Sequence, residues 1–169
     1  PRTGRTAFNP YGSTALNEDY CEGTAWQWSW FVPHDVDGLV ELMGVRDAFI
    51  CKLDSLFTAD SKLEGESTSV DISGLIGQYA HGNEPSHHIA HLYNYVGQPW
   101  RTQEIVDEVL HTLYFNNPDG LSGNEDCGQM SAWYILNAMG FYQVCPGKPV
   151  YALCRLLFNQ ATVHLKAGK

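Results

Sequence analysis

Three short segments of the sequence combine carboxylates, amides or imidazoles with aromatic residues or glycines. In the first segment, 20–30, Glu22 stands beside Gly23 and is followed by three tryptophans. Apolar walls disfavour the charged form of a carboxyl group, so a glutamate in such a pocket keeps its proton near neutral pH and can act as a general acid. The alternative is an exposed Glu22 near a helix start, with the tryptophans in the core.

The second segment, 81–91, offers carboxylate and amide oxygens as well as imidazoles. Oxygen ligands suit a hard cation such as calcium. His87 and His91 are one helical turn apart and could instead hold zinc, although the zinc-protease pattern needs a glutamate where His88 stands. The alternative is a helix N-terminus, where the helix dipole favours Glu84.

The third segment, 118–129, places acidic and amide side chains around two glycines, just before an apolar run. A helix N-terminus holds a carboxylate in its ionised form, which would suit Asp126 to the role of a general base. The alternative is that Asp126 and Gln129 form a capping box. A protonated glutamate and an ionised aspartate are the pair that glycoside hydrolysis requires, on opposite sides of the sugar ring.

The elements that must position these segments are mostly helical. Apolar residues recur with helical spacing over 36–57, 86–96, 102–114 and 128–140. Asp35 stands where an N-cap belongs, and Gly97 is a C-terminal stop for the second helix. The alternating, β-branched run at 161–165 predicts a strand. Polar loops at 60–73, 80–86 and 116–128 would gather the chemistry at one end of the helices.

Composition excludes several classes of function. The 169 residues are 44% hydrophobic and 17% charged, which fits one globular domain with a core. The net charge of −9 would repel phosphate backbones, so nucleic acid is not an expected partner. No apolar run is long enough for a membrane span, and residues 1–15 do not read as a signal peptide. Because the chain opens at Pro1 without methionine, we expect a piece of a longer protein.

Five motifs, in this order, resemble glycoside hydrolase family 92. They are Glu22-Gly-Thr-Ala-Trp-Gln-Trp, Val32-Pro-His-Asp-Val-Asp-Gly-Leu, Gly82-Asn-Glu-Pro-Ser-His-His-Ile-Ala, Leu92-Tyr-Asn-Tyr-Val-Gly-Gln-Pro and Gly123-Asn-Glu-Asp-Cys-Gly-Gln-Met-Ser-Ala-Trp-Tyr, the last continuing into Met139-Gly-Phe-Tyr-Gln-Val-Cys-Pro-Gly. The resemblance extends over residues 11–165, nearly the whole chain.

The resemblance implies a calcium-dependent, inverting exo-α-mannosidase that acts on terminal α-linked mannose of glycans, with α-1,2 linkages among the candidates. It implies an N-terminal β-sandwich, an (α/α)6 barrel and a C-terminal β region. The chain would then be mainly α, with part of the (α/α)6 catalytic barrel over 1–145 and the start of the β region over 146–169. The upstream N-terminal domain of the parent chain would complete the site, so we expect the isolated chain to be inactive.

The family pattern also implies site residues and a location. Glu22 falls on the general acid and Asp126 on the general base. Asn124 falls on an assisting position where members carry Asp, and Glu125 is the other residue that would assist. Asn83 and Glu84 fall where the family gathers calcium ligands, and Trp26, Gln27, His87 and His88 would line the sugar pocket. The family implies a secreted, periplasmic or cell-surface protein.

Two rival interpretations remain open on the sequence. A metal-independent (α/α)6 glycosidase, such as a glucoamylase-like or trehalase-like enzyme, would ignore a chelator. A non-catalytic glycan-binding fragment would bind sugars through its tryptophans and hydrolyse nothing.

Overall fold

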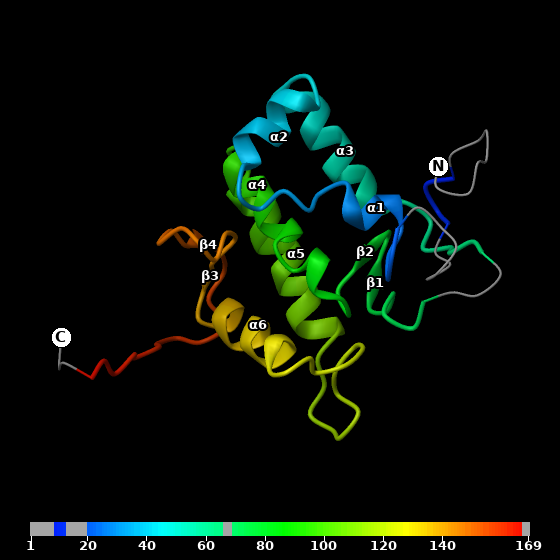
Figure 1. The fold of residues 1–169 in the computed structure, drawn as a ribbon. Coiled ribbons are helices and arrows are strands. Elements are labelled where there is room, and N and C mark those ends of the chain that lie inside the picture. Colours follow the sequence, from blue (N-terminus) through cyan, green and yellow to red (C-terminus); the bar gives the residue numbers. More distant parts are fainter. Residues whose placement is uncertain (1–8, 13–19, 66–68, 167–169) are drawn as a thin grey trace.

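The computed structural model describes residues 9–12, 20–65 and 69–166. The chain is mostly helical with short two-stranded hairpins, as the apolar spacing predicts (Figure 1). Part of the polar loop predicted at 60–73, and residues 167–169 of the predicted β region, lie outside the described residues.

The predicted helix over 36–57 is two helices, α2 (Val36–Leu42) and α3 (Arg46–Thr58). Asp35 caps α2 as predicted, because its carboxylate accepts a hydrogen bond from the Gly38 N–H at 3.1 Å. The break comes at Gly44, whose φ of 108° lies outside the helical region. Glycine adopts such a φ without steric cost, so the chain turns here and starts a second helix.

The predicted helix over 86–96 is wrong in type. The segment forms two 3-10 turns, η1 (Glu84–Ser86) and η2 (Ile89–His91), followed by the single turn α4 (Leu92–Tyr95). The residues from Ser86 to Tyr93 are all buried, and two of their imidazoles bond to backbone carbonyls of other segments. These anchors fix a tight path, and the positive φ of Gly97 then ends α4 as predicted.

Two further predicted helices are confirmed. Helix α5 (Pro99–Thr112) begins with Pro99 in its first turn, where the missing N–H is not needed, and buries Ile105, Val106, Val109 and Leu110. Helix α6 (Gln129–Ala138) follows Gly128 and stops before Gly140. Both helices therefore start and end within about three residues of the predicted bounds.

The strands are not where the alternating pattern predicts them. Strand β1 (Leu75–Ile76) pairs antiparallel with β2 (Tyr79–Ala80), and β3 (Phe141–Tyr142) pairs antiparallel with β4 (Ala152–Leu153). Residues 161–165 have no regular secondary structure, and Val163 and Leu165 are exposed. A strand needs a neighbour for its backbone hydrogen bonds, and the described residues offer this run none.

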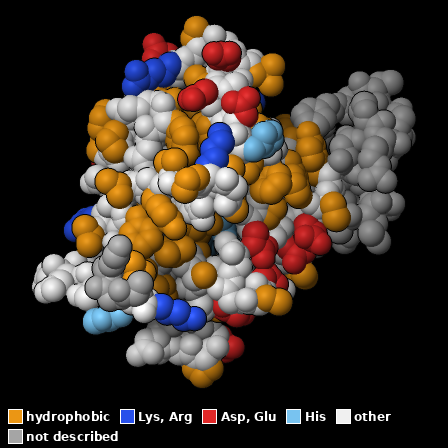
Figure 2. All heavy atoms as spheres, turned by 60° about the vertical axis from the view of Figure 1, so that its left-hand side comes forward, with side chains coloured by type: hydrophobic (Ala, Val, Ile, Leu, Met, Phe, Trp, Pro, Cys, Tyr) orange, Lys and Arg blue, Asp and Glu red, His pale blue; other side chains and the backbone are white. Residues whose placement is uncertain are grey.

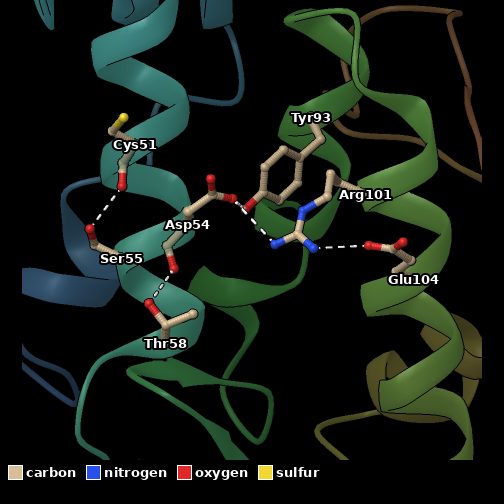
Figure 3. A network of polar contacts seen from close by, with 7 residues as sticks. All are labelled: Cys51, Asp54, Ser55, Thr58, Tyr93, Arg101 and Glu104. Atoms are coloured by element: carbon tan, nitrogen blue, oxygen red, sulfur yellow. Dashed lines mark hydrogen bonds and ion pairs between the residues drawn. The ribbon is translucent and has the colours of Figure 1, made fainter.

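A polar network joins α3 to α4 and α5 (Figure 3). Asp54 accepts a hydrogen bond from the Tyr93 hydroxyl at 2.7 Å and pairs with Arg101 at 3.3 Å. Arg101 also pairs with Glu104 at 2.9 Å and lies over the Tyr93 ring. Burial raises the pKa of Tyr93 above its ordinary value, so the hydroxyl stays a donor.

Hairpin β1–β2 is attached to α3, because the Gln78 N–H donates to the Leu56 carbonyl.

Hydrophobic side chains remain exposed over much of the surface (Figure 2). They include Val150, Tyr151, Leu153, Leu156 and Phe158 near the C-terminal end, and Leu42 and Val45 between α2 and α3. Large exposed apolar patches mark interaction surfaces or ligand-binding grooves. Among the described helices, none has both the length and the apolar character to cross a bilayer.

Candidate active site

The three segments singled out in the sequence meet in the structure. The Asn83 amide donates a hydrogen bond to the Glu22 carbonyl at 2.9 Å, which joins the first segment to the second. A Cβ added to Gly123 would lie 2.8 Å from the Gly82 carbonyl oxygen, so the third segment runs against the second. The Gln129 amide also contacts His87 at 3.1 Å. The structure therefore brings the loops of Glu22, Asn83 and Asp126 together.

Glu22 lies in the loop before the short helix α1 (Ala25–Trp28). Its side chain is exposed, so the described residues do not form the apolar enclosure expected around it. Its backbone φ is 54°, in the left-handed region that favours glycine. The Trp28 indole N–H donates to the Cys21 carbonyl at 2.9 Å and braces this loop.

Gln27, which the motifs place in the sugar pocket, also holds the start of α1. Thr24 caps the helix, and the Gln27 side-chain oxygen accepts hydrogen bonds from the Thr24 N–H at 2.6 Å and hydroxyl at 2.8 Å. The Gln27 amide donates to the Gln78 carbonyl at 2.5 Å. Gln27 is buried and both ends of its amide are occupied, so it fixes the loop that carries Glu22.

Asp126 also has a left-handed backbone, with a φ of 49°. Within the described residues, Glu22, Asp126 and Cys127 are the non-glycine residues with positive φ. This conformation costs roughly 1–3 kcal/mol per residue, and it persists where the surrounding structure imposes it. Both carboxylates named as acid and base therefore stand on strained backbone.

The predicted capping box of Asp126 and Gln129 is wrong. The N-cap of α6 is Gly128, and the carboxylate that serves the helix start is Glu125. Glu125 accepts hydrogen bonds from the Ser131 N–H at 3.3 Å and hydroxyl at 3.0 Å. Within the described part of the chain, the exposed Asp126 carboxylate makes no hydrogen bond, so it is open to a water or a substrate. Asn124, beside Glu125, is likewise exposed.

His87 and His88 are buried, at 1% and 4% exposure, and their rings contact backbone carbonyls. Nε2 of His87 lies 2.9 Å from the His81 carbonyl oxygen, and Nε2 of His88 lies 2.7 Å from the Trp30 carbonyl oxygen. Burial lowers the pKa of His87 to about 4 and that of His88 below its usual value. Both rings are therefore neutral near pH 7.

A zinc pair of His87 and His91 does not form. His91 is fully buried and stacks on the Tyr142 ring, with centroids 4.9 Å apart. Both ring nitrogens of His87 already face other protein groups. Across the described ranges, no three His, Cys, Asp or Glu side chains gather as a metal site.

Asn83 and Glu84 offer a partial set of ligands for a hard cation. The Asn83 amide nitrogen donates to the Glu22 carbonyl. The side-chain oxygen of Asn83 is left as a ligand, together with the carboxylate of its neighbour Glu84. Such oxygens fit calcium, which takes six to eight oxygen ligands. The described residues supply only part of that number, and the others would come from waters, substrate or further protein.

Trp26 lines a separate cavity of about 410 Å³ with Tyr20, Ser29, Trp30 and Lys52. Glu22 is not among the residues that line it. The cavity and the loops of Glu22 and Asp126 therefore do not form a single sugar pocket from the described residues alone.

Sequence reasoning missed three contributors to this arrangement. The Thr24-x-x-Gln27 capping box has a recognisable spacing and could have been found from it. The close approach of Gly82 and Gly123, and the bond between His87 and Gln129, join distant segments, so no local pattern signals them.

The loops of Glu22, Asn83 and Asp126 therefore meet, with Glu22 and Asp126 both on left-handed backbone. The model of the glycosyl hydrolase family 92 catalytic domain matches residues 1–169. The chain belongs to this family, as its motifs predict.

Solved structures and a curated protein are similar to the chain. The family GH92 α-mannosidase of Bacteroides thetaiotaomicron is 42% identical with a TM-score of 0.83, over 98% of this chain and 20% of that one. Its complex with mannoimidazole gives a TM-score of 0.81 over 90% of this chain. An uncharacterized secreted glycosidase of Arthroderma benhamiae is 28% identical over 157 residues, which are 92% of this chain. The chain spans 18% of that fungal protein, so it corresponds to a part of these relatives.

Proposed function

We propose that the protein containing this chain removes terminal α-linked mannose from glycans by an inverting, calcium-dependent mechanism. The observation that carries the proposal is the left-handed backbone at both Glu22 and Asp126, the residues that the motifs name as acid and base. Strained residues of this kind cluster at active sites, where their strain is part of the positioning. The similarity to an α-mannosidase supports mannose as the sugar.

The proposed reaction is a single displacement at the anomeric carbon. Glu22 starts protonated and gives its proton to the glycosidic oxygen as the bond between that oxygen and the anomeric carbon breaks. Asp126 starts ionised and takes a proton from the water that attacks the opposite face of the sugar. The products are mannose of inverted configuration and an aglycone with a free hydroxyl. Inversion needs the two carboxyl groups about 6.5–9.5 Å apart, which leaves room for the water.

The neighbours of Asp126 would assist it in different ways. Glu125 is tied to Ser131, so it holds the base loop on the start of α6. Asn124 is exposed, and its amide would orient the attacking water.

Calcium is the cation proposed for this site, with Asn83 and Glu84 among its ligands. When bound, the ion would hold sugar hydroxyls and favour the distorted ring of the transition state. The Asn83 amide also supports the Glu22 carbonyl, so this residue would link the cation site to the acid loop.

The rest of the parent protein would complete the site and cover the exposed apolar faces. We propose the same overall plan as in the family resemblance, with part of an (α/α)6 barrel here and an N-terminal domain closing the sugar pocket. The similarity to a secreted glycosidase supports a location outside the cytoplasm. Linkage preference, including α-1,2, would be set by contacts outside these loops.

The roles of acid and base are tested by two substitutions in the full-length enzyme. Glu22→Gln removes the proton donor and should lower kcat for ordinary mannosides about 10²–10⁴-fold, with a smaller loss for substrates whose leaving group needs no protonation. Asp126→Asn should abolish turnover of both substrates while leaving binding intact. Glu41→Gln and Asp119→Asn make the same chemical changes at exposed positions and should leave kcat unchanged. A folded Asp126→Asn enzyme with normal turnover would rule out the assignment.

A further inference from the structure

We propose that His87 and Gln129 form a positioning pair that fixes the base loop against the acid loop. Gln129 is the first residue of α6 and follows Asp126 by three positions. His87 lies in the buried segment between η1 and η2. The proposal rests on the proposed function, because it takes Asp126 as the base.

The hydrogen bonds around His87 allow one arrangement of its proton. Nε2 faces the His81 carbonyl at 2.9 Å, and a carbonyl only accepts, so Nε2 must carry the proton. Nδ1 of the neutral ring then carries a lone pair. The Gln129 amide, 3.1 Å away, must therefore present its NH2 group to Nδ1 as a donor. The same NH2 group also reaches the Tyr142 hydroxyl at 3.4 Å.

His87 joins α6 to the second segment at several points. The Trp133 indole N–H, one turn after Gln129, donates to the His87 carbonyl at 2.9 Å. The His87 ring in turn donates to the His81 carbonyl, two residues before Asn83. Asn83 donates to the Glu22 carbonyl. A continuous set of bonds therefore runs from the helix that follows the base to the loop that carries the acid.

This path has a direct bearing on an inverting reaction. The gap between the two carboxyl groups must admit one water, and a displacement of about 1 Å in a catalytic group costs on the order of 10²-fold in rate. The backbone of Asp126 is in the left-handed region, and its carboxylate makes no hydrogen bond within the described residues. The buried bond between His87 and Gln129, at the first turn of α6, therefore limits the displacement of Asp126. The pair therefore acts on the rate through position, without touching the substrate.

The test uses Gln129→Leu and His87→Gln in the full-length enzyme. Leucine keeps the size of Gln129 but donates no hydrogen bond. Glutamine at position 87 keeps an N–H donor for the His81 carbonyl, but it has no ring Nδ1, so its acceptor oxygen no longer sits at the fixed position that faces Gln129. The control is Thr102→Val, which removes a buried hydrogen bond of 2.9 Å to the Ala90 carbonyl and leaves the bonds of His87, Gln129 and Asn83 in place. For each variant, kcat, KM and the thermal midpoint are measured with aryl α-mannosides of good and poor leaving groups.

We expect kcat to fall about 10- to 100-fold in both variants, equally for the two kinds of leaving group, with KM within about twofold. The double variant should be no slower than the slower single variant, because both changes break one interaction. Thr102→Val should lower the midpoint and leave kcat unchanged. A normal kcat in Gln129→Leu, or additive losses in the double variant, would overturn the positioning role. Normal turnover by Asp126→Asn would instead overturn the proposed function, so the two failures are distinguishable.

Discussion

The substitution Gly123→Ala should push the loop of Asp126 away from the loop of Asn83. Gly123 has a φ of 83°, which costs an L-residue about 1 kcal/mol or more. Its added Cβ would also lie 2.8 Å from the Gly82 carbonyl oxygen and 3.0 Å from the Ser73 hydroxyl. Backbone must move to relieve the first contact, at a cost of about 1–3 kcal/mol. We therefore expect Gly123→Ala to lose roughly 3 kcal/mol of stability.

Two other glycines separate these costs. Gly44 has a φ of 108°, but a Cβ there would meet nothing within 4 Å, so Gly44→Ala measures the backbone cost alone. Gly147 has neither a positive φ nor a neighbour within 4 Å, so Gly147→Ala should be neutral or slightly stabilising. The difference between Gly123→Ala and Gly44→Ala isolates the contact between the two loops.

The assay is the thermal midpoint and kcat of the full-length enzyme and its three variants. The midpoint should fall in the order Gly147→Ala, Gly44→Ala, Gly123→Ala. Only Gly123→Ala should also lower kcat, because a shifted loop moves Asp126 relative to Glu22. If Gly123→Ala melts and turns over like Gly44→Ala, the loops are not in contact and the reasoning fails.

Three further predictions concern metal, pH and the isolated chain. EDTA should abolish α-mannosidase activity, and Ca²⁺ should restore it; recovery with Zn²⁺ alone would contradict the oxygen-ligand site. Burial lowers the pKa of His91 to about 3, so the unfolded chain binds more protons than the folded chain between that value and the ordinary 6.5. The free energy of unfolding should therefore fall as pH drops below about 6.5, by about 1.4 kcal/mol per pH unit for this group. His91→Phe should flatten this dependence of stability on pH, whereas His111→Gln, at an exposed position, should not. Residues 1–169 expressed alone should not hydrolyse aryl α-mannosides at any calcium concentration, because the apolar faces stay uncovered; robust, calcium-dependent turnover would refute this.

Local signals predicted the helices that have one buried and one exposed face. In α5, the spacing of Ile105, Val106 and Val109 matches the buried side, and Asp35 and Gly97 mark an N-cap and a stop as expected. The prediction for 86–96 missed the two 3-10 turns because residues 86–93 are all buried, although the apolar spacing is helical. The contacts of the buried imidazoles with backbone carbonyls outside this segment decide its path, and these contacts have no local sequence signal.

The motifs name candidate site residues, but they do not give the geometry of the loops that carry them. The motifs named Glu22 and Asp126, yet the left-handed φ of each has no sequence signal, because glycine is the residue that usually marks such positions. Glu125, one position before Asp126, contacts Ser131 at the start of α6, and only the loop conformation shows which of these neighbouring carboxylates does so. The bond from Asn83 to Glu22 joins distant segments and needs the fold.

The central claim is that the enzyme inverts α-mannosides with Glu22 as acid and Asp126 as base. The most direct measurement is proton NMR of the anomeric signals during hydrolysis of an aryl α-mannoside by the full-length enzyme. The mechanism predicts that β-mannose appears first and that α-mannose grows later by mutarotation. Initial release of α-mannose, or no release of mannose by the folded, calcium-loaded enzyme, would contradict the account.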